Sequence, residues 1–320
     1  MHIGQSYKLL EFLLWTRRNI YWLFVIGAIP TILYQVLQWK WIALPWTVVA
    51  LLGTATAFIV GFKNTQTYSR TWEARQIWGS ILNSSRAWGI MCRDYMDDVK
   101  ASKELIYRHF AWLTALRYQM RESKAWESTH KIYNKEYMAY YSVPEKESTL
   151  ELELAKYIPA EEVLQIMATK NKAVQLLGLQ SKTIKELYDQ GILDNFRFLE
   201  MHKLITTLYD HQGKSERIKN FPYPRQFATV SSMFVKLFCI MLPFSMLKDF
   251  DKLNENIGGI MQGQMVWLVI PFSMLISWVY TSLEQVGEST ENPFEGSAND
   301  VPISQMSRTI EIDMREMLGE

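Results

Sequence analysis

Few residues in this chain have the types and spacing that catalysis requires. The most suggestive group is the tetrapeptide YMDD at positions 95–98. It matches the catalytic segment of reverse transcriptases, where paired aspartates at a hairpin tip hold magnesium. Here it follows a stretch with helical periodicity, and no strand pattern surrounds it. We therefore interpret Asp97 and Asp98 as part of a solvated helix face.

The other reactive side chains are equally dispersed. Zinc hydrolysis needs histidines at ligand spacing around a carboxylate, and no pair among the five histidines provides it: they stand at positions 2, 109, 130, 202 and 211. The segment GGIMQG at 258–263 is better interpreted as a flexible turn than as a phosphate loop, and no serine follows a nucleophile-elbow pattern. The sequence predicts a protein that is not an enzyme and needs no metal or cofactor.

Charge and composition direct attention to the membrane. The formal net charge of +1 over 320 residues gives no sign of a nucleic-acid partner. The 48% of hydrophobic residues are concentrated near the two ends of the chain, whereas residues 64–227 are rich in charged and amide side chains. A mean hydropathy of -0.09 is what membrane segments joined to a large polar body would give. The two cysteines, Cys92 and Cys239, do not suggest a disulfide scaffold.

Four stretches approach the length of about 20 apolar residues that crosses a bilayer. They are residues 19–38, 44–62, 228–247 and 265–280, the last interrupted by Pro271. Arg17 and Arg18 precede the first stretch, and lysines and arginines open the long segment that follows the second. Positive residues favour the cytoplasmic side, so we expect both termini and the middle segment to lie in the cytoplasm. No small-residue cleavage site follows an early apolar core, so the first stretch is not interpreted as a removed signal peptide.

The expected organisation has four parts. Residues 1–62 would hold an N-terminal tail and two spans, 63–227 a helical cytoplasmic region, 228–282 two more spans, and 283–320 a cytoplasmic C-terminal tail. Apolar residues in the middle segment recur at intervals of three and four residues, which is typical of amphipathic helices. Apolar and polar residues do not alternate there over the length of a strand. The fold class predicted is therefore an all-α membrane protein with a helical cytoplasmic body.

The second stretch carries two adjacent helical rows. Gly53, Ala57 and Gly61 form a small-residue row, which lets helix backbones approach closely in lipid. Thr54, Phe58 and Phe62 fall at i, i+4 and i+8 beside it; we call this set the phenylalanine row. Periodicity alone favours lipid or core contact for the phenylalanine row.

The same helix has no strong breaker before Gly79, although its character changes from apolar to polar. A helix of about 40 residues extends about 60 Å, twice the hydrocarbon thickness. It could line a path that starts in the membrane and continues through a cytoplasmic body. The polar half, with Arg70 and Trp78 among its residues, would anchor the helix there, and we expect Glu73 to pair with Arg70 or Arg75.

Three segments resemble the bestrophin family. GFKNTQTYSRTWEARQIWG at 61–79 is similar to the G-F-x-N-x-x-x-Y-x-R-W-W-E-A-R-x-x-W-G signature of bacterial bestrophins. ERIKNFPYPRQF at 216–227 and the tail from ENPFEGSANDVP at 291–302 are similar to two further family segments. The resemblance covers most of the chain in the same order.

The resemblance implies a homopentamer around a central pore lined by the second membrane helix. It places the hydrophobic neck of that pore on Thr54, Phe58 and Phe62, and a cytoplasmic aperture near Phe196. Thr54 departs from the commonly apolar outermost neck position, which suggests a wetter upper neck. Gly53, Ala57 and Gly61 would let five copies pack.

The tail segment differs from that of animal relatives. Animal members sense calcium through an acidic run after N-P-F, but this chain offers only Glu295 and Asp300 there, too few for the six or more oxygens that calcium prefers. Calcium gating is therefore not expected. Asn292, Pro293 and Phe294 would instead begin a tail that packs on neighbouring subunits, as the resemblance implies.

We therefore predict a homopentameric channel of the bacterial inner membrane, whose partners are its own copies, lipid and small monovalent ions. Anions such as chloride are favoured, because phenylalanine edges are electropositive, but rings that present their faces would favour sodium or potassium. A monovalent cation channel of the same architecture is the first alternative. A non-conducting structural or partner-binding membrane protein is the second. A membrane enzyme would need polar clusters in the spans, and almost none occur.

Overall fold

A computed structural model describes residues 8–137, 141–255 and 258–320 of the chain. Over these residues the fold is helical and contains no strand. His2 and the rest of the first seven residues of the expected N-terminal tail lie outside the described residues. The main helices are α1 (Leu9–Gln35), α2 (Trp46–Asp94), α3 (Val99–Arg121), α4 (Ile132–Tyr137), α5 (Pro144–Glu147), α6 (Leu150–Leu154), α7 (Ala160–Met167), α8 (Lys172–Asp189), α9 (Asn195–Asn220), α10 (Arg225–Lys252), α11 (Val269–Ser289) and α12 (Ile303–Met317).

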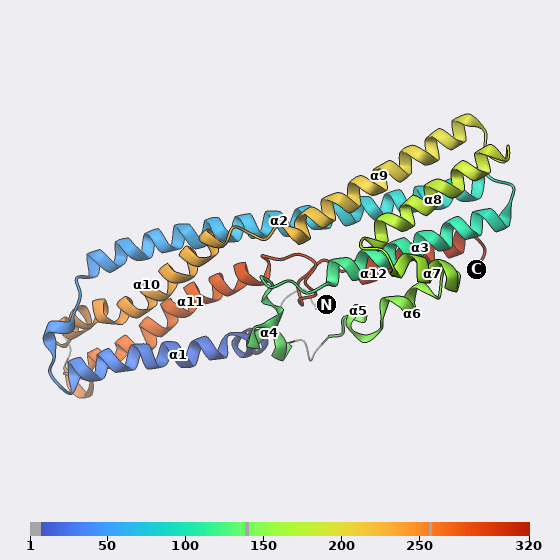
Figure 1. The fold of residues 1–320 in the computed structure, drawn as a ribbon. Coiled ribbons are helices and arrows are strands. Elements are labelled where there is room, and N and C mark those ends of the chain that lie inside the picture. Colours follow the sequence, from blue (N-terminus) through green and yellow to red (C-terminus); the bar gives the residue numbers. More distant parts are fainter. Residues whose placement is uncertain (1–7, 138–140, 256–257) are drawn as a thin grey trace.

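The molecule is elongated, with two helical groups at opposite ends (Figure 1). One group holds α1, the first half of α2, α10 and α11; the other holds the second half of α2 with α3, α5 to α9 and α12. Helix α2 belongs to both. It has 49 residues, so it extends about 75 Å. Gly79 does not end it: the helix continues to Asp94, because an isolated glycine costs only about 1 kcal/mol when the helix packs on both sides.

Three helices among the described residues are long and apolar enough to cross a membrane: the segments Lys40–Asp94, Arg225–Glu255 and Met265–Ser289. Helix α1, which holds the first expected span, is not among them, and it includes Arg17 and Arg18 within its length. It nevertheless packs along α10 and α11. Pro271 falls in the first turn of α11, after the 3₁₀ turn Met265–Leu268, so it lies at the start of this helix and does not interrupt it.

The body is built around a single core. Trp78 and Trp88 of α2 and Trp112 of α3 are fully buried in it, together with aliphatic residues of α8, α9 and α12. This packing confirms an all-helical body. The segment 142–149 includes the short helix α5, and Pro159 occupies the N-cap position of α7.

The YMDD segment forms the turn between α2 and α3. Helix α2 ends at Asp94, and Asp98 caps α3: its Oδ1 accepts hydrogen bonds from the backbone N–H groups of Lys100 (2.9 Å) and Ala101 (3.1 Å). The expected helix face was therefore wrong in detail. An aspartate before a helix satisfies backbone donors that the helix leaves free, and this decides its position.

The C-terminal tail packs on its own chain. Phe294 is fully buried, with its ring 6.3 Å from that of Trp78, and α12 lies against α2 and α3. The helices approach closely at Gly89, where an added Cβ would lie 3.1 Å from Met317 Sδ and 3.2 Å from Met314 Cγ. Phe294 itself packs within its own chain, and the expected contact between the rest of this tail and neighbouring subunits stays a prediction.

Candidate functional site: the exposed row on α2

The phenylalanine row lies on a face of α2 that no other described segment covers. Phe58 is 76% exposed and Phe62 53% exposed, and Thr54 is exposed beside them. The opposite face of the same helix is buried against α10 and α11, through Val49, Thr56 and Val60 among others. One side of α2 therefore holds the helix in place while the other presents two aromatic rings and a threonine.

The hydroxyl proton of Thr54 is already engaged in a hydrogen bond. Its hydroxyl donates to the backbone carbonyl of Ala50 at 3.0 Å, so the proton is used within the helix. Thr65 and Ser69 on the exposed face below Phe62 do the same with the carbonyls four residues earlier, at 3.0 and 2.9 Å. These hydroxyls keep acceptor capacity but no free proton. The exposed face of α2 thus passes from apolar rings to hydroxyl oxygens.

Within one chain the members of the small-residue row differ in burial, and their expected role in the packing of five copies stays a prediction. Gly53 is buried, and an added Cβ there would lie 2.7 Å from the ring of Phe238 on α10. Ala57 and Gly61 are exposed, and nothing lies within 4 Å of an added Cβ at Gly61. Gly53 therefore serves the packing of α2 on α10 inside one chain, because the helical repeat of 3.6 residues rotates each fourth residue away from the previous one.

Immediately after Phe62 along the chain, α2 is held in place by charged contacts. Lys63 is 3% exposed, and its Nζ lies 2.7 Å from Glu284 Oε1 of α11; Ser231 of α10 donates to the other oxygen of Glu284 at 2.6 Å. A buried lysine needs such a partner, since an unpaired charge costs several kcal/mol in the interior. The contact sets the rotation of α2 where it leaves the apolar group of helices.

The expected ion pair between Glu73 and a neighbour on its own helix does not form. Arg70 donates instead to the backbone carbonyls of Ile218 and Phe221 at the end of α9, and Glu73 pairs with Arg217. Both contacts link α2 to α9 and not α2 to itself. Carbonyls at a helix C-terminus lack internal partners, which makes them good acceptors for an arginine. Sequence spacing alone could not reveal a helix 150 residues away.

Phe196 lies at the opposite end of the body from the apolar helices, at the start of α9 (Figure 1). It is 81% exposed, and Asp194 caps its helix by accepting from the N–H groups of Phe196 and Arg197, at 2.8 and 3.0 Å. Residues 8–137, 141–255 and 258–320 leave most of this ring uncovered. Along the axis of the molecule, Phe196 and the phenylalanine row are thus two separate exposed aromatic positions.

The tail carboxylates are occupied by hydrogen bonds. Glu295 is 1% exposed and accepts from the N–H and the hydroxyl of Ser128, at 2.9 and 2.8 Å. Asp300 accepts from the N–H groups of Phe294, Gly296 and Val301, and it pairs with Arg121. Burial raises the pKa of Glu295 to about 8. Over the described parts of the chain, no group of three or more potential metal ligands gathers here or elsewhere.

Sequence reasoning missed the contacts that the tail segment around Glu295 makes with the rest of the body. Beside it, Lys219 and Glu127 form an ion pair that is almost completely buried. Lys219 lies in the ERIKNFPYPRQF segment and Glu295 in the tail segment, so two of the three family-like segments meet at one place. The signal available in the sequence was the charged residue inside each segment, but its partner could not be identified without the fold.

Comparison with known proteins gives the same picture at the level of the family. The family model described as Bacterial/Fungal Bestrophin protein matches residues 17–316. Curated relatives include the voltage-dependent anion channel-forming protein YneE of Escherichia coli K12, 26% identical over 271 residues that cover 85% of this chain and 76% of the relative. A similar protein of Ralstonia nicotianae, RSc3414, is 25% identical over 274 residues, covering 85% of this chain and 76% of its own length.

The fold also matches that of a solved structure. The crystal structure of a bacterial bestrophin homologue from Klebsiella pneumoniae superimposes with a TM-score of 0.79 at 24% sequence identity. The match covers 95% of this chain and 98% of the other. At this level of identity the likeness establishes the fold.

Proposed function

Because the chain belongs to the family of bacterial and fungal bestrophins, we propose that it forms a homopentameric ion channel whose pore is lined by α2. The observation that carries this proposal is the phenylalanine row: Phe58 and Phe62 are exposed on a helix whose opposite face is buried. Five copies around an axis would turn these rows toward one another and form a hydrophobic neck at Thr54, Phe58 and Phe62. Such a neck controls conduction by admitting or excluding water.

The permeant ions are proposed to be small monovalent anions such as chloride. The curated relatives are named as voltage-dependent anion channel-forming proteins, which supports this sign of charge. An aromatic ring that turns its edge to the pore presents partial positive charge to a dehydrated anion. The runner-up is a monovalent cation channel of the same architecture, in which the ring faces would attract the ion.

The proposed setting is the bacterial inner membrane. Helices α1, α2, α10 and α11 would provide four spans, with both termini and the body in the cytoplasm. Arg17 and Arg18, which precede the first span, favour this orientation, and so do the basic residues of α2 after Phe62. The chain would then be divided as the sequence suggests, at residues 62, 227 and 282. Phe196, at the far end of the body, is the proposed cytoplasmic aperture.

A reconstitution experiment tests the proposal. Purified protein in liposomes should pass chloride, and a planar bilayer with a gradient of NaCl should give a reversal potential of the sign expected for an anion. Native mass measurement should give five subunits. Phe58→Ala and Phe62→Ala should raise the flux, because a wider and less apolar neck is wetted more easily. Phe24→Ala, which removes an exposed ring of α1 instead, is the matched control.

The main alternative is a membrane protein that binds a partner and conducts nothing. In that case the phenylalanine row would be ordinary packing against lipid or protein. Absence of flux through the wild-type protein, or equal flux through wild type and both neck variants, would support this alternative. A reversal potential of the opposite sign would leave the architecture in place and identify the channel as cationic.

A further inference from the structure

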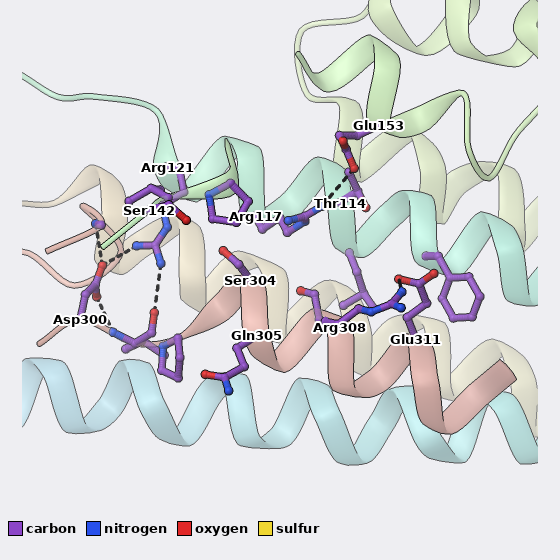
Figure 2. Close-up of a pocket in the computed structure, with 18 of the residues that line it drawn as sticks. Thr114, Arg117, Arg121, Ser142, Glu153, Asp300, Ser304, Gln305, Arg308 and Glu311 are labelled. Atoms are coloured by element: carbon purple, nitrogen blue, oxygen red, sulfur yellow. Dashed lines mark hydrogen bonds and ion pairs between the residues drawn. The ribbon is translucent and has the colours of Figure 1, made fainter. Parts of the chain in front are cut away.

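A cavity of about 590 Å³ lies in the body, away from the phenylalanine row. It is bounded by α3, by the segment from Tyr141 to Tyr157, and by the tail from Gly296 to Arg315 on α12. Figure 2 shows Arg117 and Arg121 of α3 on one side and Ser304 and Arg308 of α12 on the other. Pockets that bind small organic molecules have about this size, roughly 300–1,000 Å³.

Among the residues that line this cavity, cations outnumber anions. Five lining residues are cationic (Arg117, Arg121, Lys156, Arg308 and Arg315) and three are anionic (Glu153, Asp300 and Glu311), so five minus three leaves +2. Glu145 lies behind the wall, fully buried, and pairs with Arg117 at 2.9 Å, which reduces the sum to +1. Glu320 pairs in turn with Arg315 at 3.1 Å, so the carboxylates in and behind the wall balance its cations. The wall therefore attracts an anion through the hydrogen-bond donors of its arginines and lysine and not through a net charge.

The floor of the cavity has unused donor capacity. Arg117 makes one hydrogen bond, from Nη1 to Glu145 Oε1 at 2.9 Å, whereas its Nη2 lies 3.7 Å from Glu153 Oε2, beyond hydrogen-bond range. The Nε atoms of Arg117 and Arg121 have no hydrogen-bond partner within the described structure. A buried guanidinium that is only partly paired is a ready donor to a carboxylate or a phosphate.

The rim can rearrange easily. Lys156 pairs with Glu153 at 2.7 Å and Arg308 with Glu311 at 2.9 Å, each three residues away on its own segment, and the two cations are 58% and 64% exposed. Exposed pairs of this kind contribute little to stability, because water screens them and both side chains lose freedom. A multiply charged anion at the rim can therefore take both cations from their present partners.

We propose that this cavity binds a small organic molecule with a multiply charged oxyanion group, a phosphate or a polycarboxylate. The volume exceeds the needs of an inorganic ion, and Leu113, Val143, Pro144 and Tyr157 supply apolar wall for the rest of the molecule. Arg117 would hold the charged group from the floor, and Lys156 and Arg308 from the rim. The bound molecule would join α12 to α3 and so stabilise the tail against the body.

Binding to the full-length protein in detergent tests this proposal without any measurement of ion flux. Isothermal titration and thermal unfolding would be followed with AMP and with citrate, which distinguish a phosphate from a polycarboxylate. Adenosine, which lacks the charge, and inorganic phosphate, which lacks the organic part, are the comparison ligands. Saturable binding of AMP or citrate should raise Tm, since a ligand that binds only the folded state stabilises it, and added NaCl should weaken it.

Variants of the rim connect the binding to this cavity. Arg308→Ala and Lys156→Ala change exposed side chains, so the fold should be kept, and each should weaken binding about tenfold or more. Arg93→Ala and Lys182→Ala remove exposed cations from α2 and α8, outside the cavity wall, and should leave binding unchanged. The proposal is overturned if neither AMP nor citrate binds at millimolar concentration, or if the rim variants bind them as the wild type does.

Discussion

Glu295 shows how much a single side chain depends on its surroundings. It is nearly without solvent contact, and the carboxylates of Asp300 and Glu127 raise its pKa further, in addition to burial. The two hydrogen bonds from Ser128 act in the opposite sense, and the pKa nevertheless lies near 8 instead of 4.5. Arg121 and Lys219 are engaged by Asp300 and Glu127, so neither pairs directly with Glu295.

This shift predicts that the contribution of Glu295 to stability falls as pH rises from about 4.5 to about 8. Between these values the folded state holds a proton on Glu295 and the unfolded state does not, so each rise in pH favours unfolding. Glu295→Gln, which mimics the protonated form, should remove this contribution, so that Tm falls less, or rises more, with pH than in the wild type over this range. The measurement is thermal unfolding in detergent across the range, with Glu186→Gln on α8 as an exposed control; equal slopes for wild type and Glu295→Gln would contradict the prediction.

At the scale of the helix, the buried contacts of α2 determine which of its residues remain outside. An added methyl at Gly53 would overlap the ring of Phe238, whereas at Gly61 it would meet open space. Gly53→Ala should therefore lower the free energy of unfolding by about 1–3 kcal/mol through overpacking. Gly61→Ala, eight residues along the same helix, should be neutral or slightly stabilising, since alanine favours the helix. Thermal unfolding of both variants in one detergent checks this; equal losses at both positions would mean that Gly53 has no special contact.

The sequence predicted the helices better than their contacts. Periodicity and the lack of proline indicate that α2 continues out of the apolar stretch, and the structure confirms and lengthens it. The helix-helix partners could not be predicted, because Gly53 opposite Phe238 and Arg70 at the end of α9 join residues more than 140 positions apart. The same limit explains Glu73, whose partner is Arg217 and not a neighbour on the helix. Spacing along one helix reveals its faces, but only the fold reveals what each face meets.

Of the two candidate sites, one could be predicted from the sequence and the other could not. The phenylalanine row could be identified from spacing once its helix was recognised, and its exposure is visible in one chain. The cavity in the body could not, because its wall combines α3, the segment 141–157 and the tail, three regions without a shared motif. A site on one helix is encoded locally. A site formed between distant segments depends on the tertiary structure.

On the scale of the whole molecule, α2 is the helix that, among the described residues, belongs to both ends (Figure 1). Its first half carries the phenylalanine row, and its second half holds Trp78 and Trp88 in the core of the body. Gly89 near its end meets Met314 of α12, so the tail, the body and the proposed pore share one rigid element. Because one continuous helix connects the two groups, the position of its exposed face depends on the contacts that α2 makes in both of them.

The accessibility of introduced cysteines tests whether the exposed face of α2 faces the pore in the assembled protein. The natural thiols Cys92 and Cys239 are both buried, so their background reaction should be small. Thr54→Cys, on the row proposed to face the pore, should react with a charged, water-soluble methanethiosulfonate and lose ion flux, because five adducts would narrow the neck. Phe24→Cys on α1 is also exposed in a single chain, yet in lipid it should resist the same reagent. Flux through liposomes before and after reaction gives the answer. Equal reaction at both positions, or modification of Thr54→Cys without any change in flux, would show that the row does not line the path of the ions.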